Sequence, residues 1–337
     1  MVVGSSVGLV GGIGRGVGGG TTVLGMSGSQ HGVISVVGEV LVDLVAGPDG
    51  RTFTAHPGGG PANAAIAVAR LGGRAVLSTT FGDDLFGALV RAHLEESDVD
   101  IRMLSSTGAT SVAFAATDEH GVARYDFRVS WDVQAVPLVD GAAFLHTGSL
   151  AAALAPSAVE AAMRAARAAG TPVSLDPNIR PTLAGRPEVA RARFERQAGL
   201  ADVLKVSEED LEWLYPGTDP VSRAESLLIL GPRLVVLTRG PRGALAVTTA
   251  LAVERPAPAV DVVDTVGAGD AFTAGLVSVL ARREVPLGRL DETTLGDALA
   301  VATTVGAITC SRAGADSPRA DELGAVAALL DRGPASG

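Results

Sequence analysis

The sequence predicts an α/β protein with three layers, in which helices cover both faces of a mostly parallel central sheet, and with a small separate β-sheet. From Ala142 onward, short apolar segments alternate with helical segments, a pattern typical of parallel sheets covered by helices. Between about Thr107 and Val129, two runs alternate apolar and polar residues, which predicts a hairpin outside that sheet. The length of 337 residues, with 47% hydrophobic and 19% charged residues, is enough to bury a large core.

The first 32 residues are rich in glycine and serine. Glycines interrupt each short apolar run, and the single basic residue comes late, so we expect a disordered extension over residues 1–32 and not a signal peptide. Gly14, Gly16 and Gly19 form a GxGxxG pattern, but no helical period follows it, and we interpret the match as accidental. The folded part is expected at residues 33–330.

The first elements of the folded part are a strand, a helix and a second strand. Residues 34–37 form a short apolar run, and an alternating stretch continues to about residue 45. Pro61 suits the first turn of a helix, where its missing N–H costs nothing, and apolar residues recur after it at helical spacing until Gly72. The segment RAVLSTTFG that follows predicts the next strand.

The middle of the chain predicts the small sheet. Two alternating runs flank residues 118–121, Asp-Glu-His-Gly, which is a hairpin signal. Together with the stretch that follows the first strand, they predict a sheet built from residues of about 40–56 and 107–130.

In the second half, the strands that alternate with helices end in polar or glycine residues. A helix is expected at residues 157–169, and the tail from 295 to 330 is expected to be mainly helical. Ligands of open parallel sheets bind beyond the carboxyl ends of the strands, so these strand ends are expected to line one site. The predicted strands are residues 142–147, 173–176, 203–206 and 234–238.

Charge and composition exclude several classes of function. The net charge of −10 argues against nucleic acid as a partner, because phosphate backbones need a basic face. Cys310 is the only cysteine, so neither an intrachain disulfide nor a cysteine zinc site can form, and the histidines lack metal-ligand spacing. No apolar run approaches the ~20 residues that cross a bilayer, so we expect a cytoplasmic protein that does not bind membranes. The P-loop string GxxxxGK[ST] is absent.

The segment from Asp264 to Asp270, DTVGAGD, has the features of an anion site. Apolar residues at helical spacing follow it, which places Asp270 at the start of a helix. Gly267, Ala268 and Gly269 can present backbone N–H groups there, and the helix dipole favours negative charge. Asp270 then either caps the helix or accepts a proton from a hydroxyl that attacks a bound phosphate.

Two strings carry a family resemblance. PGGGPANAAIAVARLGG and DTVGAGDAFTAGL resemble the two signatures of the ribokinase-like (PfkB) carbohydrate kinases, and they occur in the expected order. GEVLVDLV, DPNIRP, KVSEEDLEWLYPG and TRGPRGA are similar to strings of the fructokinase-type members, especially the bacterial fructokinases. The similarity runs from about residue 33 to 318, and it implies a ribokinase-like fold whose small sheet acts as a lid.

The resemblance implies a role for each matching residue. Asp270 matches the general base, and Gly267, Ala268 and Gly269 match the backbone anion hole that also binds nucleotide. Arg180 follows a predicted strand end, where it is either a phosphate or substrate clamp or a surface arginine. The positions implied to contact sugar are Asp43, Gly58, Gly59 and Asn63.

The resemblance also implies nucleotide and metal contacts. Thr238, Gly240 and Gly243 match the loop that holds ATP, and Glu208 matches the acid that orients hydrated Mg²⁺. Lys205, the only lysine, stands where the commoner family pattern has asparagine; it either reaches a nucleotide phosphate or is solvated at a strand end. In some relatives a monovalent cation such as K⁺ is bound at positions that match Asp264, Val266 and Gly314.

The implied activity is transfer of the γ-phosphate of ATP to a sugar, with D-fructose giving fructose 6-phosphate. In relatives, the lid excludes water and often pairs with a second subunit, so we expect closure over the sugar and a homodimer through the lid. Alternatives within the family are 2-keto-3-deoxygluconate kinase, ribokinase and nucleoside kinase. Alternatives of another class are a non-catalytic sugar- or nucleotide-binding module and an oxidoreductase that uses the GxGxxG pattern.

Overall fold

The computed structural model describes residues 32–104, 108–117, 123–283 and 286–332. The extension expected at residues 1–32 and the turn expected at residues 118–121 therefore lie outside the described residues, apart from Gly32.

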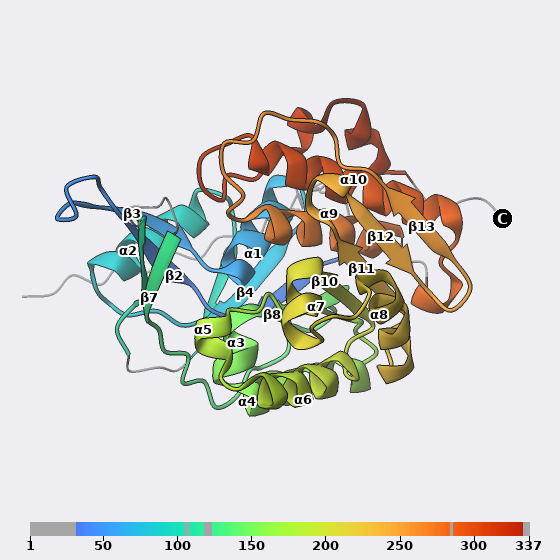
Figure 1. Cartoon of the computed structure of the whole chain (residues 1–337), viewed down its shortest axis with the longest axis horizontal. Coiled ribbons are helices and arrows are strands. Elements are labelled where there is room, and N and C mark those ends of the chain that lie inside the picture. The colour runs from blue at the N-terminus through green and yellow to red at the C-terminus, as the bar shows by residue number, and fades with distance from the viewer. Residues whose placement is uncertain (1–31, 105–107, 118–122, 284–285, 333–337) are drawn as a thin grey trace, which may run out of the picture. The chain divides into compact units, whose positions relative to one another are not determined.

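The large sheet has nine strands in the order β13-β12-β11-β10-β9-β8-β1-β4-β5 (Figure 1). Strands β5 to β11 of this order pair in parallel, while β12 runs antiparallel to both of its neighbours. The predicted α/β class with a mostly parallel central sheet is confirmed. The strands are β1 (Ile34–Val37), β4 (Ala75–Thr79), β5 (Asp100–Met103), β8 (Phe144–Gly148), β9 (Val173–Asp176), β10 (Val203–Ser207), β11 (Leu234–Thr238), β12 (Ala244–Val247) and β13 (Ala252–Arg255).

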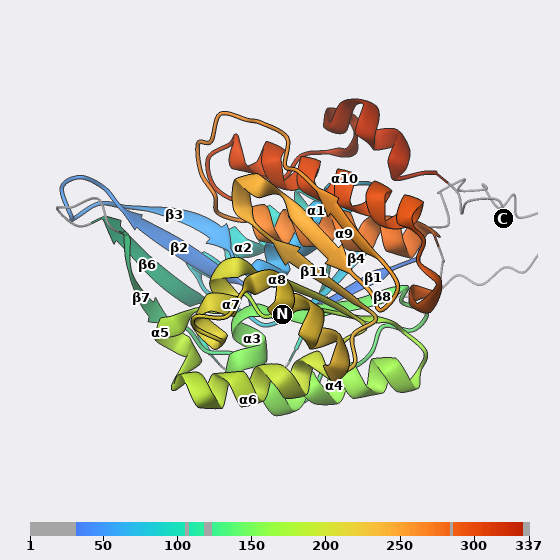
Figure 2. The same ribbon diagram turned by 45° about the vertical axis from the view of Figure 1, so that its right-hand side comes forward.

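Helices cover both faces of this sheet, as Figures 1 and 2 show. On one face lie α1 (Gly60–Arg70), α9 (Ala268–Arg283) and α10 (Glu292–Cys310), and on the other lie α4 (Pro156–Ala168), α6 (Pro187–Ala198), α7 (Glu208–Leu214) and α8 (Pro220–Ser226). The inner strands are buried on both faces and mostly apolar, although buried polar residues such as His146, Ser174 and Lys205 also lie in them. The remaining helices are α2 (Leu85–Glu95), α3 (Ser149–Leu154) and α5 (Pro181–Ala184).

α10 is the one helix among the described residues with the length and hydropathy to span a bilayer, but 67% of that window is buried inside the protein. It packs against α9 as a core helix, which explains its apolar composition.

The small sheet contains four strands in the order β3-β2-β6-β7. Its residues, 41–58 and 111–128, overlap the ranges expected for a lid. Leu41 and Ala113 of the sheet pack against Leu150 of α3, with Leu183 of α5 beside them, so the small sheet contacts the helices that follow β8 and β9 (Figure 2). The strands are β2 (Leu41–Ala46), β3 (Phe53–Gly58), β6 (Ser111–Thr117) and β7 (Ala123–Arg128).

The tail from 295 to 330 is mainly helical, as expected, but in two separate pieces. α10 ends at Cys310, and a 3₁₀ segment at Ala320–Leu329 follows, with Gly324 at a positive φ of 57°. Alanine-rich composition favours helix, but glycine at a positive φ interrupts it. The short strands β12 and β13 were not predicted, since neither shows a marked apolar alternation.

Candidate active site

Asp270 lies in the first turn of α9 and is 8% exposed. Asn63 Nδ2 of α1 donates to Asp270 Oδ2 at 2.9 Å, and Asn178 Nδ2 donates to Asp270 Oδ1 at 3.3 Å. Within the described residues, the carboxylate makes no hydrogen bond to its own helix, so it is not a helix cap. Burial raises the pKa of Asp270 to about 7, although the Asn63 hydrogen bond lowers it. The group is therefore poised to exchange a proton near neutral pH.

The loop before α9, predicted to form an anion hole, makes a tight turn at Gly267. Gly267 has a φ of 75°, and a Cβ there would lie 2.4 Å from the Cβ of Ala315, so only glycine fits. The first turn of a helix has N–H groups without intrahelical acceptors, which favours an anion. The N–H of Ala268 is already engaged by the carbonyl oxygen of Thr265, at 3.3 Å.

Lys205 is buried beneath this loop. It is 4% exposed, and its Nζ lies 2.9 Å from Asp176 Oδ2 at the end of β9. A Cβ on Gly269 would lie 3.1 Å from the same Nζ. Burial alone would lower the pKa of Lys205, but the nearby carboxylates, first that of Asp176, raise it above its usual value, so the ammonium stays charged. The interpretation of Lys205 as a solvated lysine is wrong.

The residues expected to contact sugar lie at the junction of the small sheet and α1. Asp43 of β2 is half-buried, and burial raises its pKa to about 6, opposed by the charges of His56 and Arg180. A Cβ on Gly58 would lie 2.5 Å from Asp43 Oδ2, so glycine keeps this carboxylate accessible. Gly59, with φ of 109°, lies against the backbone of residue 39.

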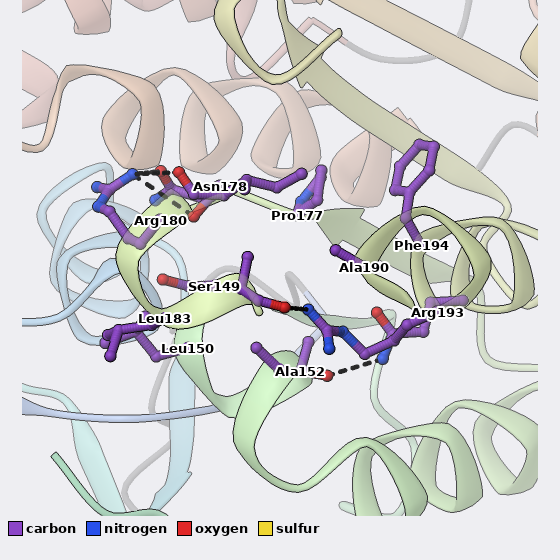
Figure 3. Close-up of a pocket in the computed structure, with 14 residues that line it drawn as sticks. Ser149, Leu150, Ala152, Pro177, Asn178, Arg180, Leu183, Ala190, Arg193 and Phe194 are labelled. Carbon is purple, nitrogen blue, oxygen red and sulfur yellow. Dashed lines mark hydrogen bonds between the residues drawn. The ribbon is translucent and has the colours of Figure 1, made fainter. Parts of the chain in front are cut away.

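Arg180 is exposed, but its charge acts on both Asp43 and Asp270, where it lowers the pKa of each carboxyl. The guanidinium therefore lies between the acid on the small sheet and the acid on α9. Figure 3 shows Arg180 next to Asn178, to which it donates a hydrogen bond.

The residues expected to hold nucleotide follow β11. Thr238 ends the strand, and Gly240 and Gly243 both have positive φ angles, 54° and 85°. The two glycines bound a single 3₁₀ turn, and a Cβ on Gly243 would lie 2.0 Å from the carbonyl oxygen of Arg255. The loop is thus a tight turn at the carboxyl end of a strand, as the sequence predicts.

Glu208, the expected magnesium-orienting residue, is paired with an arginine in this structure. Arg242 Nη2 lies 2.6 Å from Glu208 Oε1 and 2.5 Å from Oε2. Two residues later, Asp210 is buried and accepts a hydrogen bond from the backbone N–H of Ile179 at 2.8 Å. Glu208 is thus held by Arg242 of the loop after β11, while Asp210 holds the loop after β9.

The three positions expected to bind a monovalent cation are brought together. Asp264 Oδ1 accepts from the N–H of Val266 at 3.0 Å, and Asp264 Oδ2 accepts from the N–H of Gly314 at 2.9 Å. Gly314 has a positive φ of 70°. Both carboxylate oxygens of Asp264 are thus engaged by backbone N–H groups, and binding of a cation here stays a prediction. No group of three or more His, Cys, Asp or Glu residues in the described chain has the arrangement of a metal site.

Sequence analysis assigned no individual role to three contributors to this site: Asp176 and Asn178, which were expected only as part of a strand end that lines it, and Asp210, which was not expected there. All three follow or border the strand ends that were expected to line it. The available signal was the polar string DPN at the end of β9, but the partners of its side chains come from distant parts of the chain.

A model of the pfkB family carbohydrate kinases matches residues 33–322. The chain belongs to this family. A fructokinase from Klebsiella pneumoniae is 37% identical over 307 residues, which cover 87% of this chain and 99% of the relative. Fructokinase-1 from Oryza sativa is 36% identical over 312 residues, which cover 86% of this chain and 95% of the relative.

Solved structures of other kinases share the fold. A fructokinase from Vibrio cholerae with bound fructose, ADP and calcium has a TM-score of 0.74 and 30% identity, covering 89% of this chain and 98% of its own. An aminoimidazole riboside kinase from Salmonella enterica, with aminoimidazole riboside and an ATP analog, has a TM-score of 0.74 and 28% identity, covering 88% of this chain and 99% of its own. The predicted resemblance to carbohydrate kinases is confirmed.

Proposed function

We propose that this protein is an ATP-dependent sugar kinase that transfers the γ-phosphate of ATP to D-fructose, giving fructose 6-phosphate. The observation that carries the proposal is the position of Asp270: a buried carboxyl with a raised pKa, at the N-terminal turn of a helix that can receive a phosphoryl group. The similarity to fructokinases over most of the chain supports fructose as the acceptor.

In the proposed reaction, Asp270 accepts the proton of the attacking sugar hydroxyl. The backbone N–H groups around Gly267 and Gly269 face the phosphoryl oxygens, and the buried ammonium of Lys205 adds positive charge beneath them. Because these donors are fixed before substrate binds, little reorganisation is needed when charge develops.

The sugar and the nucleotide are proposed to contact different elements of the fold. Asp43, Asn63 and the backbone at Gly58 and Gly59 are proposed to bind the sugar hydroxyls, with Arg180 beside them. Thr238, Gly240 and Gly243 are proposed to hold the nucleotide.

Two cations belong to the proposal. Mg²⁺ would neutralise part of the charge on the ATP phosphates, with Glu208 oriented toward its water shell, and K⁺ would occupy the loop formed by Asp264, Val266 and Gly314. The relatives with bound nucleotide contain calcium in one case and potassium in another, which supports a divalent and a monovalent requirement.

The small sheet is proposed to close over the sugar and exclude water, since hydrolysis of ATP competes with transfer. We also propose a homodimer through this sheet and a cytoplasmic location. Phe53, whose ring packs edge-on against that of Phe114 in the same sheet, is 46% exposed, which supports a partner on that face.

The test is phosphorylation of a panel of sugars by purified protein with ATP and Mg²⁺, with NMR identification of the product. The panel contains fructose, ribose, 2-keto-3-deoxygluconate and a nucleoside. Fructose 6-phosphate as the favoured product supports the proposal, whereas preference for the keto acid would assign a 2-keto-3-deoxygluconate kinase. Sugar binding without any transfer would identify a non-catalytic binding module.

A further inference from the structure

Asn178 links two charged groups of the site through its side-chain amide. Its Nδ2 donates to Asp270 Oδ1 at 3.3 Å, and its Oδ1 accepts from Arg180 Nη1 at 2.6 Å. A carboxylate can only accept and a guanidinium can only donate, so these two neighbours together determine which way round the amide lies.

The backbone of Asn178 is strained. Its φ of 39° lies in the left-handed region, which costs free energy for any residue with a side chain. Ser149, after the neighbouring strand β8, also has a positive φ, of 52°. Both side chains meet at Gly60, where a Cβ would lie 3.2 Å from Ser149 Oγ, 3.2 Å from Asn178 Nδ2 and 3.1 Å from Asp270 Oδ1. The strain is therefore concentrated around the carboxylate of Asp270.

Packing holds this loop only in part: Ile179 packs against the apolar core, but a cavity lies beside the loop. A cavity of about 30 Å³ lies behind residues 177–180, between them and α6, with Arg193 and Gln197 on its opposite wall (Figure 3). A space of this size holds about two water molecules. The loop is also tied by the hydrogen bond from the N–H of Ile179 to Asp210 Oδ1. Its position next to Asp270 thus depends on this hydrogen bond as well as on the apolar contacts of Ile179.

We infer that Asn178 is a positioning residue for the base, whose amide, oriented by Arg180, holds the Asp270 carboxylate in one rotation. The inference rests on the proposed function. Asn63 donates to Oδ2 from α1, so one amide fixes each carboxylate oxygen and a lone pair on each remains for the sugar hydroxyl.

Three other charged groups act on Asp270. They are Asp176 at the end of β9, Lys205 of β10 and Arg180 of the loop after β9. Asp176 raises the pKa of Asp270, and the two cations lower it. Removal of the Asn178 amide also releases Arg180, which donates to Asn178 Oδ1, so the measured effect is that of the amide together with the guanidinium that orients it.

The substitution Asn178→Gly tests the inference, because glycine accepts the positive φ and removes only the amide. We expect kcat to fall by about 10- to 100-fold, with the unfolding temperature and the affinity for ATP maintained. The matched control is Asp98→Gly. Asp98 follows α2, away from the site, and has a similar positive φ of 55°, so glycine there should leave kcat unchanged. An unchanged kcat in Asn178→Gly, or an increase in the KM for sugar alone, overturns the inference.

A second measurement needs no substrate. A hydrogen bond to a carboxylate favours its charged form, so loss of the amide should raise the pKa of Asp270. Carbon-13 NMR of the Asp270 carboxyl group measures this pKa in Asn178→Gly and in the unaltered protein. A pKa that stays the same or falls overturns the inference. If the unaltered protein phosphorylates no sugar, the proposed function fails, and this titration still decides the role of Asn178.

Discussion

Asp270 and Asp43 are two acids of the site whose pKa values are raised, and they lie in regions with different architecture. Asp270 stands on a core helix behind a sheet whose inner strands are buried on both faces. Asp43 stands on a four-stranded sheet with exposed apolar side chains and is itself half-buried. Arg180 acts on both acids, which links the two regions electrostatically.

This difference in burial matches the two proposed roles, proton transfer for Asp270 and sugar recognition for Asp43. Burial raises the pKa of Asp270 to about 7, further than the pKa of Asp43, which is raised to about 6. A base that works near neutral pH needs such desolvation, and only a closely packed region supplies it. A residue that contacts sugar needs a surface that can open and close, which the small sheet offers.

The largest effect is expected from Asp270→Asn. Without the base, the rate should fall by roughly 10²- to 10⁴-fold, while ATP still binds. Steady-state kinetics and calorimetric titration with an ATP analog measure the two quantities. A rate equal to that of the unaltered protein would remove Asp270 from its role.

Lys205→Met should destabilise the protein by about 3–5 kcal/mol, because it leaves the buried carboxylate of Asp176 without its partner. Arg74→Ala is the matched control, since it breaks an exposed pair with Asp100 and should cost at most about 1 kcal/mol. Urea unfolding gives both free energies. Equal losses in the two variants would show that the Lys205 pair is not buried in solution.

Activity and stability should depend on pH over different ranges for Asp270 and Asp43. Asp270 must lose its proton to act, so kcat/KM should rise about tenfold per pH unit up to about pH 7. Its pKa in the folded protein lies above the ordinary value of 3.8, so its contribution to stability is lost as pH rises from about 4 to about 7.

Asp270→Asn lacks this loss and should be more stable than the unaltered protein at pH 8. Asp43→Asn should also be more stable than the unaltered protein at high pH. The destabilisation that it removes should develop over a narrower pH range, which ends near pH 6. Thermal unfolding across pH checks both, and identical stability curves for the two variants would contradict the comparison.

Asp43→Asn should raise the KM for sugar by about tenfold, through loss of a charged acceptor, and change kcat less. Kinetics with fructose as the varied substrate measure this split. A fall in kcat at unchanged KM would place Asp43 in the chemistry, together with Asp270.

The smallest effect is expected at the pair of Glu208 and Arg242, whose side chains are 25% and 68% exposed. Arg242→Ala should change stability by less than about 1 kcal/mol. Glu208→Gln should raise the Mg²⁺ concentration that gives half-maximal rate, whereas the exposed neighbour Glu209→Gln should not. The same Mg²⁺ dependence in both variants would exclude Glu208 from orienting the ion.

Local patterns predicted much of this protein. The strand at residues 34–37, the helix after Pro61 and the position of Asp270 at a helix start all follow from periodicity and turn chemistry within short windows. Long-range partners were not predictable in this way. Asn178 and Asp270 are 92 residues apart, and Arg242 and Glu208 are 34 residues apart. A single sequence contains no signal for which side chains pair across such distances.

The course of the chain at Gly59 has a consequence for how substrate binding is detected. Strand β3 of the small sheet ends at Gly58, and α1 begins at Gly60, with Asn63 in its first turn. A tilt of the small sheet about Gly59 would therefore rotate the start of α1 directly and alter the hydrogen bond from Asn63 to Asp270. Binding of sugar to the small sheet and the orientation of the Asp270 carboxylate would then be coupled through the backbone at Gly59. No rearrangement of the packed core would be needed.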